Sequence, residues 1–201
     1  MWRNGATLRN RRLAPPARVE HNRRARPKQI MSHPAQSPSE PQATEAPLRV
    51  VFNSPQSGYM SVGLSAGARE FSTVVACRPY DSLSDLIDAL TAFLGGDEHT
   101  RVVRWNCEPD EIDFRFSPED AGRLRLEVCH YATNARAAET CRTVISVSNT
   151  RREIGGAFLH ALTELERDKE VDVFESNWRR EFPALRLRAL DEAFGALAGG
   201  E

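Results

Sequence analysis

The residues of this chain that could do chemistry gather in one short stretch, Trp105 to Glu111, which reads WNCEPDE. Its carboxylates could serve as an acid–base pair, as ligands for a cation, or as contacts for a basic partner. A catalytic pair needs one carboxyl in an apolar pocket, and a calcium loop needs regularly spaced oxygen ligands around a glycine. The stretch shows neither pattern. We therefore interpret its acidic end as a four-residue hairpin loop with Pro109 at the second position, and we expect it to contact a partner. The candidate partner-binding residues here are Asn106, Glu108, Asp110 and Glu111.

The cysteines and histidines lack the spacing of a metal or nucleophile site. The four cysteines include no closely spaced pair of the kind that binds zinc, and the adjacent Cys129 and His130 would point to opposite faces of a strand. No nucleophile elbow, P-loop, dinucleotide-binding glycine motif or HExxH motif occurs. We predict no catalytic, metal or cofactor-binding residues, no cofactor, and buried, reduced thiols. A ligand-binding or enzymatic pocket between sheet and helices is kept as an alternative, with Trp105, Asn106, Glu108 and His130 as its candidates.

A second candidate contact is the group Trp178, Arg179 and Arg180 near the C-terminus. Trp178 follows Phe174 by about one helical turn, so it could anchor a short helix to the core. Alternatively, the tryptophan is half-exposed and forms a protein contact with its two arginines, because both residue types are enriched at interface hot spots. Packing is the favoured interpretation, and both are kept.

Alternating apolar residues predict the strands of a sheet. The predicted strands are residues 48–54, 58–65, 69–78, 100–107, 111–117, 123–131 and 140–148. Charged residues alternate with apolar ones in the later strands, so we expect a sheet solvated on one side. Attraction between opposite charges favours a register with Asp113 opposite Arg125.

Helical spacing predicts a helix over 80–96, with Ser82 and Asp85 as a capping box and Gly95 as its left-handed end. Another helix is predicted from Thr150, capped by Glu153. Gly155 and Gly156 in its first turns indicate close packing against the sheet. A short helix, a break at residues 182–183 and a final helix complete the chain. The fold class predicted is α+β: a mainly antiparallel sheet of about six or seven strands, one helix inserted after the third strand, and two or three C-terminal helices on one face.

The N-terminal segment differs from the rest in composition. Residues 1–46 are rich in proline and show little apolar periodicity, so we predict disorder there and a single domain over 48–201. Residues 1–28 hold nine basic residues and one acidic one. Three interpretations stay open: an arm that binds nucleic acid, an organelle transit peptide, or a mis-assigned start in which residues 1–30 are not expressed and Met31 is the true first residue.

The charge of residues 48–201 is acidic, with 18 basic and 25 acidic residues. An acidic surface suits a basic protein partner, because complementary charge steers association. No apolar stretch approaches the length of a bilayer span, and no secretory h-region is present, so we expect a cytoplasmic protein without membrane contact. The oligomeric state is open.

The motifs SGYMSVGLSAG, PYDSLSDLIDAL, W..EP.E..F.F and W..EFP, over residues 57–190, resemble an uncharacterised protein family of GC-rich bacteria. That resemblance implies an architecture without an assigned activity. From charge and the lack of a catalytic motif, we expect a non-enzymatic interaction module similar to the small acidic immunity proteins that neutralise bacterial toxins. Nucleic-acid binding by the tail is the second alternative.

Overall fold

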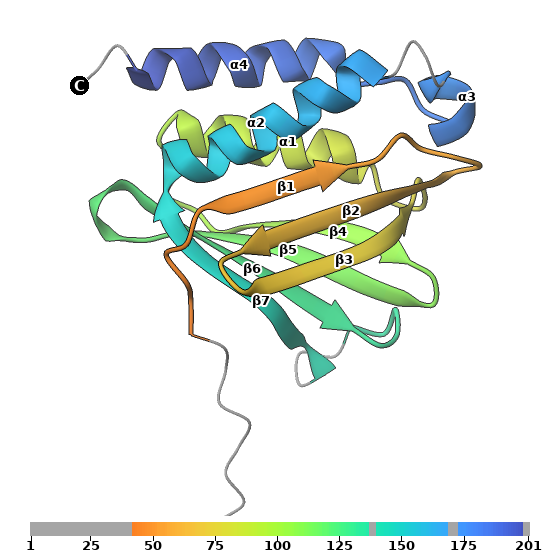
Figure 1. The fold of residues 1–201 in the computed structure, drawn as a ribbon, viewed down its shortest axis with the longest axis horizontal. Coiled ribbons are helices and arrows are strands. Elements are labelled where there is room, and N and C mark those ends of the chain that lie inside the picture. The colour runs from red at the N-terminus through yellow and green to blue at the C-terminus, as the bar shows by residue number, and fades with distance from the viewer. Residues whose placement is uncertain (1–41, 137–139, 169–172, 199–201) are drawn as a thin grey trace, which may run out of the picture. The chain divides into compact units, whose positions relative to one another are not determined.

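The computed structural model describes residues 42–136, 140–168 and 173–198. They form a seven-stranded antiparallel sheet, in which the strands follow one another in chain order, and four α-helices (Figure 1). The strands are β1 Leu48–Phe52, β2 Tyr59–Ala66, β3 Arg69–Ala76, β4 Arg101–Cys107, β5 Asp110–Pro118, β6 Arg123–Tyr131 and β7 Arg142–Thr150. The helices are α1 Ser82–Leu94, α2 Arg151–Asp168, α3 Phe174–Trp178 and α4 Ala184–Ala198, with a 3-10 turn at Asp120–Gly122. The predicted α+β fold class is confirmed. None of the described helices is long and apolar enough to cross a membrane.

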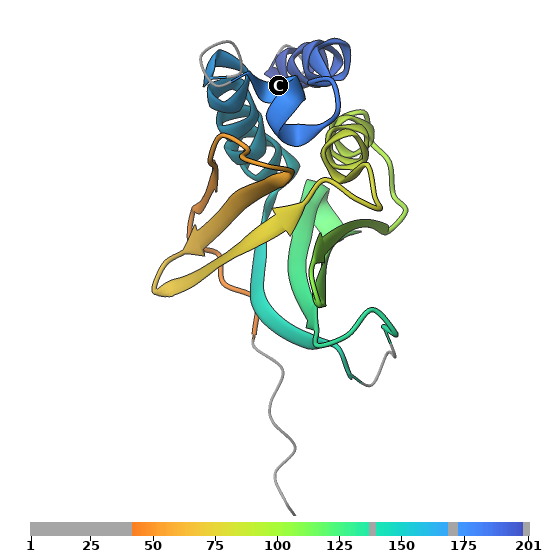
Figure 2. The ribbon, with the colours of Figure 1, turned by 90° about the vertical axis from the view of Figure 1, so that its right-hand side faces the viewer.

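The sheet is bent into two parts. β3 and β4 are paired only at Ala76 and Asn106, and from that point β1–β3 diverge from β4–β7 (Figure 2). Thr44 lies against the outer edge of β7, where its N–H donates to the carbonyl of Ser146 at 3.0 Å and its carbonyl accepts from Ser148 N–H at 2.9 Å. Thr44, which the prediction placed in the tail, thus pairs with the sheet, and residues 1–41 of the predicted tail lie outside the described residues.

Aromatic side chains from both parts of the sheet meet in the core. The Trp105 ring lies 5.5 Å from Phe114 and 6.3 Å from Phe52, centroid to centroid. Phe158 of α2 lies 5.8 Å from Phe116. All of these side chains are buried. The alternation seen in the sequence accounts for those on the strands, because one face of each strand turns toward the helices, and helical spacing accounts for Phe158.

The predicted cap of α1 is wrong. Ser82 is the first helical residue, and its hydroxyl donates to the carbonyl of Arg104 at 2.5 Å instead of capping the helix. The local pattern predicted that this hydroxyl would bond to the backbone of α1, but it bonds to a carbonyl of β4 instead. At the other end Gly96, with φ of 93°, adopts the left-handed conformation predicted for Gly95. The Thr150–Glu153 box is confirmed by reciprocal hydrogen bonds at 3.0 and 3.1 Å.

The predicted β5–β6 register is also wrong. Asp113 lies opposite Cys129, and Arg115 lies opposite Glu127. Opposite charges still lie opposite each other, but β6 is displaced along β5, so that Asp113 faces Cys129 instead of Arg125. The predicted register would turn the chain around Glu119 alone, whereas the observed one leaves room for the 3-10 turn, in which Gly122 has φ of 72°.

Gly155 and Gly156 allow helices, not the sheet, to approach α2. A Cβ at Gly155 would lie 2.9 Å from Leu94 of α1, and one at Gly156 would lie 3.1 Å from the Phe194 ring of α4. The expectation of close packing is confirmed, but the expected partner was wrong.

Candidate functional site

A buried polar cluster covers part of the sheet face that was expected to be solvated. Glu111 is 4% exposed and Asp113 is 2% exposed. Arg136, from the segment after β6, forms ion pairs with both carboxylates. The Tyr80 hydroxyl donates to Glu111 at 2.9 Å, and the Tyr131 hydroxyl donates to Asp113 at 3.2 Å. Although burial lowers the pKa of Arg136, its hydrogen bonds to Asp113 and Glu111 raise that pKa above its usual value overall. Glu111 is therefore a structural anchor rather than a free partner contact.

The hairpin between β4 and β5 is tighter than predicted. Cys107 pairs with Asp110, so the loop consists of Glu108 and Pro109 only, joined by a cis peptide bond. Proline stands at the third position of this turn, not the second. The tight turn directs the Glu108 side chain toward the start of β2, where Tyr59 lies.

Neutral groups hold the Glu108 carboxylate on both sides. The Asn106 amide donates to one oxygen at 3.1 Å, and the Tyr59 hydroxyl donates to the other at 3.3 Å. The same Asn106 amide donates to the carbonyl of Arg78 at 2.6 Å, and its oxygen accepts from the Glu108 N–H at 3.1 Å. Among the described residues no cationic side chain pairs with Glu108. This carboxylate is therefore oriented, but within the described part of the chain it has no cationic partner.

A cleft of about 450 Å³ opens beside Glu108. Its walls come from the β3–α1 loop, the β4–β5 hairpin and the segment after β6. Its lining residues are Pro79, Asn106, Glu108, Pro109, Glu111, Thr133 and Asn134. Three of the sequence-predicted contacts thus meet in one place, and no basic side chain of the described residues lines it. We call it the Glu108 cleft.

Asp110 belongs to a separate contact. One of its oxygens lies 2.7 Å from His130 Nε2, and both side chains are about one third exposed. His130 was expected among the buried residues of the apolar face of β6. It lies at the end of that face, where its side chain is partly exposed and contacts Asp110.

The three residues Trp178–Arg180 have different environments in the fold. Trp178 is 2% exposed and lies near Phe174, so the packing interpretation holds and the tryptophan is not available to a partner. Arg180 Nε donates to the carbonyl of Cys77 at 3.0 Å, which ties the α3–α4 linker to the β3–α1 loop. Arg179 is exposed.

Burial keeps the thiols of Cys107 and Cys129 protonated. It raises the pKa of Cys107 to about 11, and burial together with a hydrogen bond to Cys141 raises the pKa of Cys129 to about 12. A nucleophilic cysteine needs the opposite shift. In the part of the chain that the structure describes, no group of three or more potential metal ligands is found.

Sequence reasoning missed the residues that bind the carboxylates of the β4–β5 hairpin and of β5. Tyr59, Tyr80 and Arg136 come from three segments distant from the hairpin, and each was ordinary strand or loop composition in the sequence. From the sequence, only the acidic residues of the hairpin could be recognised as a candidate site.

No family model, curated protein or solved structure matches the chain. The resemblance to a family of GC-rich bacteria therefore remains a hypothesis. The structure defines an α+β domain with a bent antiparallel sheet and an acidic cleft at the β4–β5 hairpin, and a function has to be argued from that geometry.

Proposed function

We propose that this protein is a non-enzymatic interaction module that binds a basic segment of a partner protein, with Glu108 receiving an arginine or lysine side chain. One observation carries the proposal. The Glu108 carboxylate is held by two neutral donors at the wall of a 450 Å³ cleft, and no cationic side chain of the described residues pairs with it.

An oriented carboxylate favours binding because little side-chain entropy is lost when the partner arrives. Charge-assisted hydrogen bonds are the stronger kind, and an arginine can form two of them with one carboxylate. Asn106, Thr133 and Asn134 add neutral hydrogen-bonding groups to the same cleft. The excess of acidic over basic residues in 48–201 would speed the approach of a basic partner.

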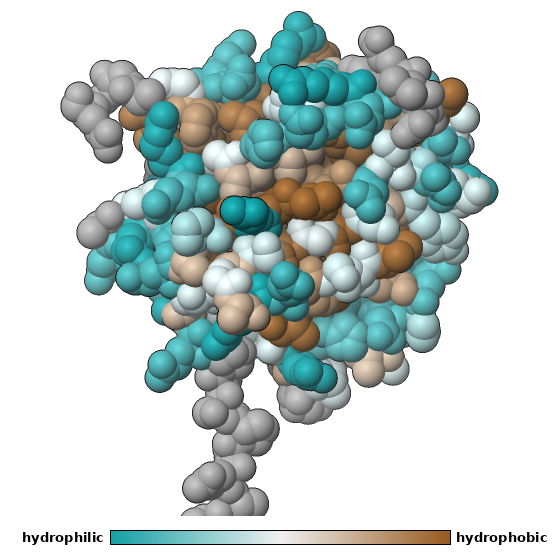
Figure 3. All heavy atoms as spheres, viewed as in Figure 1, coloured by the Kyte–Doolittle hydropathy of each residue, from teal (hydrophilic) through white to brown (hydrophobic). Residues whose placement is uncertain are grey.

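The immunity-protein version of this proposal names a toxin as the partner and the cytoplasm as the place of binding. It is supported by the acidic charge of a small α+β domain. The face seen in Figure 3 carries apolar side chains only as small, separated patches among polar ones, which suits a contact guided by charge.

The two alternatives have less support. Trp105, a candidate for an enzymatic pocket, is completely buried between aromatic rings, and His130 is engaged with Asp110. The basic tail proposed to bind nucleic acid lies outside the described residues.

The proposal is tested by capture from the native host with the full chain as bait, comparing wild type with Glu108→Gln. The control is Glu70→Gln, which removes an exposed acid from β3. We expect wild type and the control to retain one stoichiometric basic protein, and Glu108→Gln to bind it at least about tenfold more weakly, since hydrogen bonds to charged groups contribute about 1.5–3 kcal/mol. Thermal unfolding shows whether each variant is folded. Equal binding by the two variants would reject the role of Glu108.

A further inference from the structure

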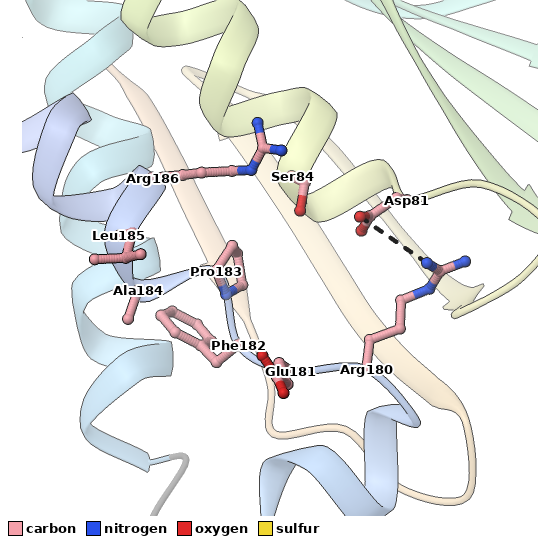
Figure 4. A pocket seen from close by; sticks show the side chains of 9 residues that line it. All are labelled: Asp81, Ser84, Arg180, Glu181, Phe182, Pro183, Ala184, Leu185 and Arg186. Carbon is pink, nitrogen blue, oxygen red and sulfur yellow. Dashed lines mark ion pairs between the residues drawn. The ribbon is translucent and has the colours of Figure 1, made fainter.

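A second cleft lies on the other side of the β3–α1 loop. It has a volume of about 640 Å³ and is bordered by the first turn of α1, the α3–α4 linker and the first turn of α4 (Figure 4). Both helices are long enough to carry a dipole, with 13 and 15 residues, and their N-terminal ends meet here. Such ends favour negative charge because their first backbone N–H groups have no partner within the helix.

Ser84 points an unused hydroxyl into this cleft. Residue Ser84 is only 9% exposed, and its side-chain oxygen faces the space between Asp81 and Pro183 (Figure 4). Among the described residues its hydroxyl has no hydrogen-bond partner, whereas the hydroxyls of Ser82 and Thr91 on the same helix both donate to carbonyl groups. The Ser84 hydroxyl can therefore donate to a ligand that enters the cleft.

The start of α1 is left uncapped beside Ser84. Asp81 occupies the N-cap position but makes no hydrogen bond to the helix backbone. Its carboxylate lies 3.9 Å from a terminal nitrogen of Arg180, which is farther than a hydrogen bond. The first-turn N–H groups, the Ser84 hydroxyl and Arg180 therefore form one set of donors.

The remaining walls limit the ligand. Phe182, Pro183 and Leu185 line the cleft, and Leu185 is 75% exposed, so an apolar group could lie against them. Asp81 and Glu181 also line it, which disfavours a doubly charged anion such as phosphate.

We propose that this cleft binds a single carboxylate joined to an apolar group, with the carboxylate accepting from Ser84 and the start of α1. Two sources share that chemistry: a small apolar carboxylic acid and the C-terminal residue of a peptide. The site is separate from the Glu108 cleft and does not depend on the proposed basic partner.

The test is a titration of the full chain with N-acetyl-L-leucine, followed through backbone amide resonances. The matched control ligand is N-acetyl-L-leucinamide, which has the same shape without the charge. We expect saturable shifts at Ser84 and Leu185 with the acid, binding at least about tenfold weaker with the amide, and weaker binding of inorganic phosphate. Ser84→Ala should bind the acid about tenfold more weakly, and Ser72→Ala, on an exposed part of β3, should bind it as wild type does.

Two further ligands separate the sources. Hexanoate tests a small acid, and a tetrapeptide ending in leucine tests a C-terminus; tighter binding of either assigns the source, and both results support the carboxylate site. Equal binding of acid and amide, tighter binding of phosphate, an unaltered Ser84→Ala variant or shifts elsewhere on the surface would overturn the proposal.

Discussion

Replacing Arg136 with methionine, an unbranched side chain without a charge, is expected to destabilise the fold strongly. The side chain of Arg136 is 16% exposed, and the side chains of its two carboxylate partners, Glu111 and Asp113, are 5% and 3% exposed. Removing one member of a buried ion pair costs about 3–5 kcal/mol because the remaining charge is stranded in a medium of low polarity. Small domains have a free energy of unfolding of about 5–15 kcal/mol in total, so the variant should unfold at a much lower denaturant concentration.

The cause of the loss can be tested by replacing the two stranded carboxylates with neutral side chains. A triple variant that also carries Glu111→Gln and Asp113→Asn should recover part of the stability at pH 7.

Urea unfolding measures this difference, with the fluorescence of the buried Trp105 and Trp178 as the signal. The matched control is Arg167→Met, because Arg167 pairs with Glu164 on the surface, where the side chains are 68% and 50% exposed. Such a pair contributes less than about 0.5 kcal/mol. A loss below about 1 kcal/mol for Arg136→Met, or no recovery of stability in the triple variant, would refute the argument.

Two further predictions follow from local packing and charge. Gly155→Ala should destabilise the protein by about 1–3 kcal/mol, because its Cβ would lie 2.9 Å from Leu94, whereas Gly195→Ala, with no atom within 4 Å, should stabilise α4 by about 0.5–1 kcal/mol. Thermal unfolding of both variants checks this, and the reverse order would contradict the packing of α2 on α1. Burial, followed by repulsion from Asp81 and Asp88, raises the pKa of Asp85. The charged form therefore weakens the fold above that pKa, so Asp85→Asn should raise the melting temperature at pH 7, and the gain should disappear as the pH falls below the range in which Asp85 titrates. A gain that persists at pH 3 would rule out charge as its cause.

The acidic hairpin shows how far the sequence of a site can be interpreted. The residue types of WNCEPDE indicated a turn that carries acids, and Glu108 does lie at such a turn. Its two hydrogen-bond donors could not be predicted together: Asn106 is two positions away, but Tyr59 is 49 positions away. Glu111 looked equivalent to Glu108 in the sequence, yet it is buried under Arg136, from a segment whose position depends on the path of the chain after β6.

The sequence by itself determined the strands, the helices and their order. Alternation and helical spacing follow from burial on one side of each element, which is a short-range property. Only the tertiary structure decided which polar groups meet. The hydroxyl of Ser82 donates to a carbonyl of β4 and does not cap α1 as predicted. The hydroxyl of Ser84 has no hydrogen-bond partner among the described residues and faces a cleft. The physical reason is that polar groups a few residues apart are similar in local pattern, and their partners are chosen when distant segments pack together.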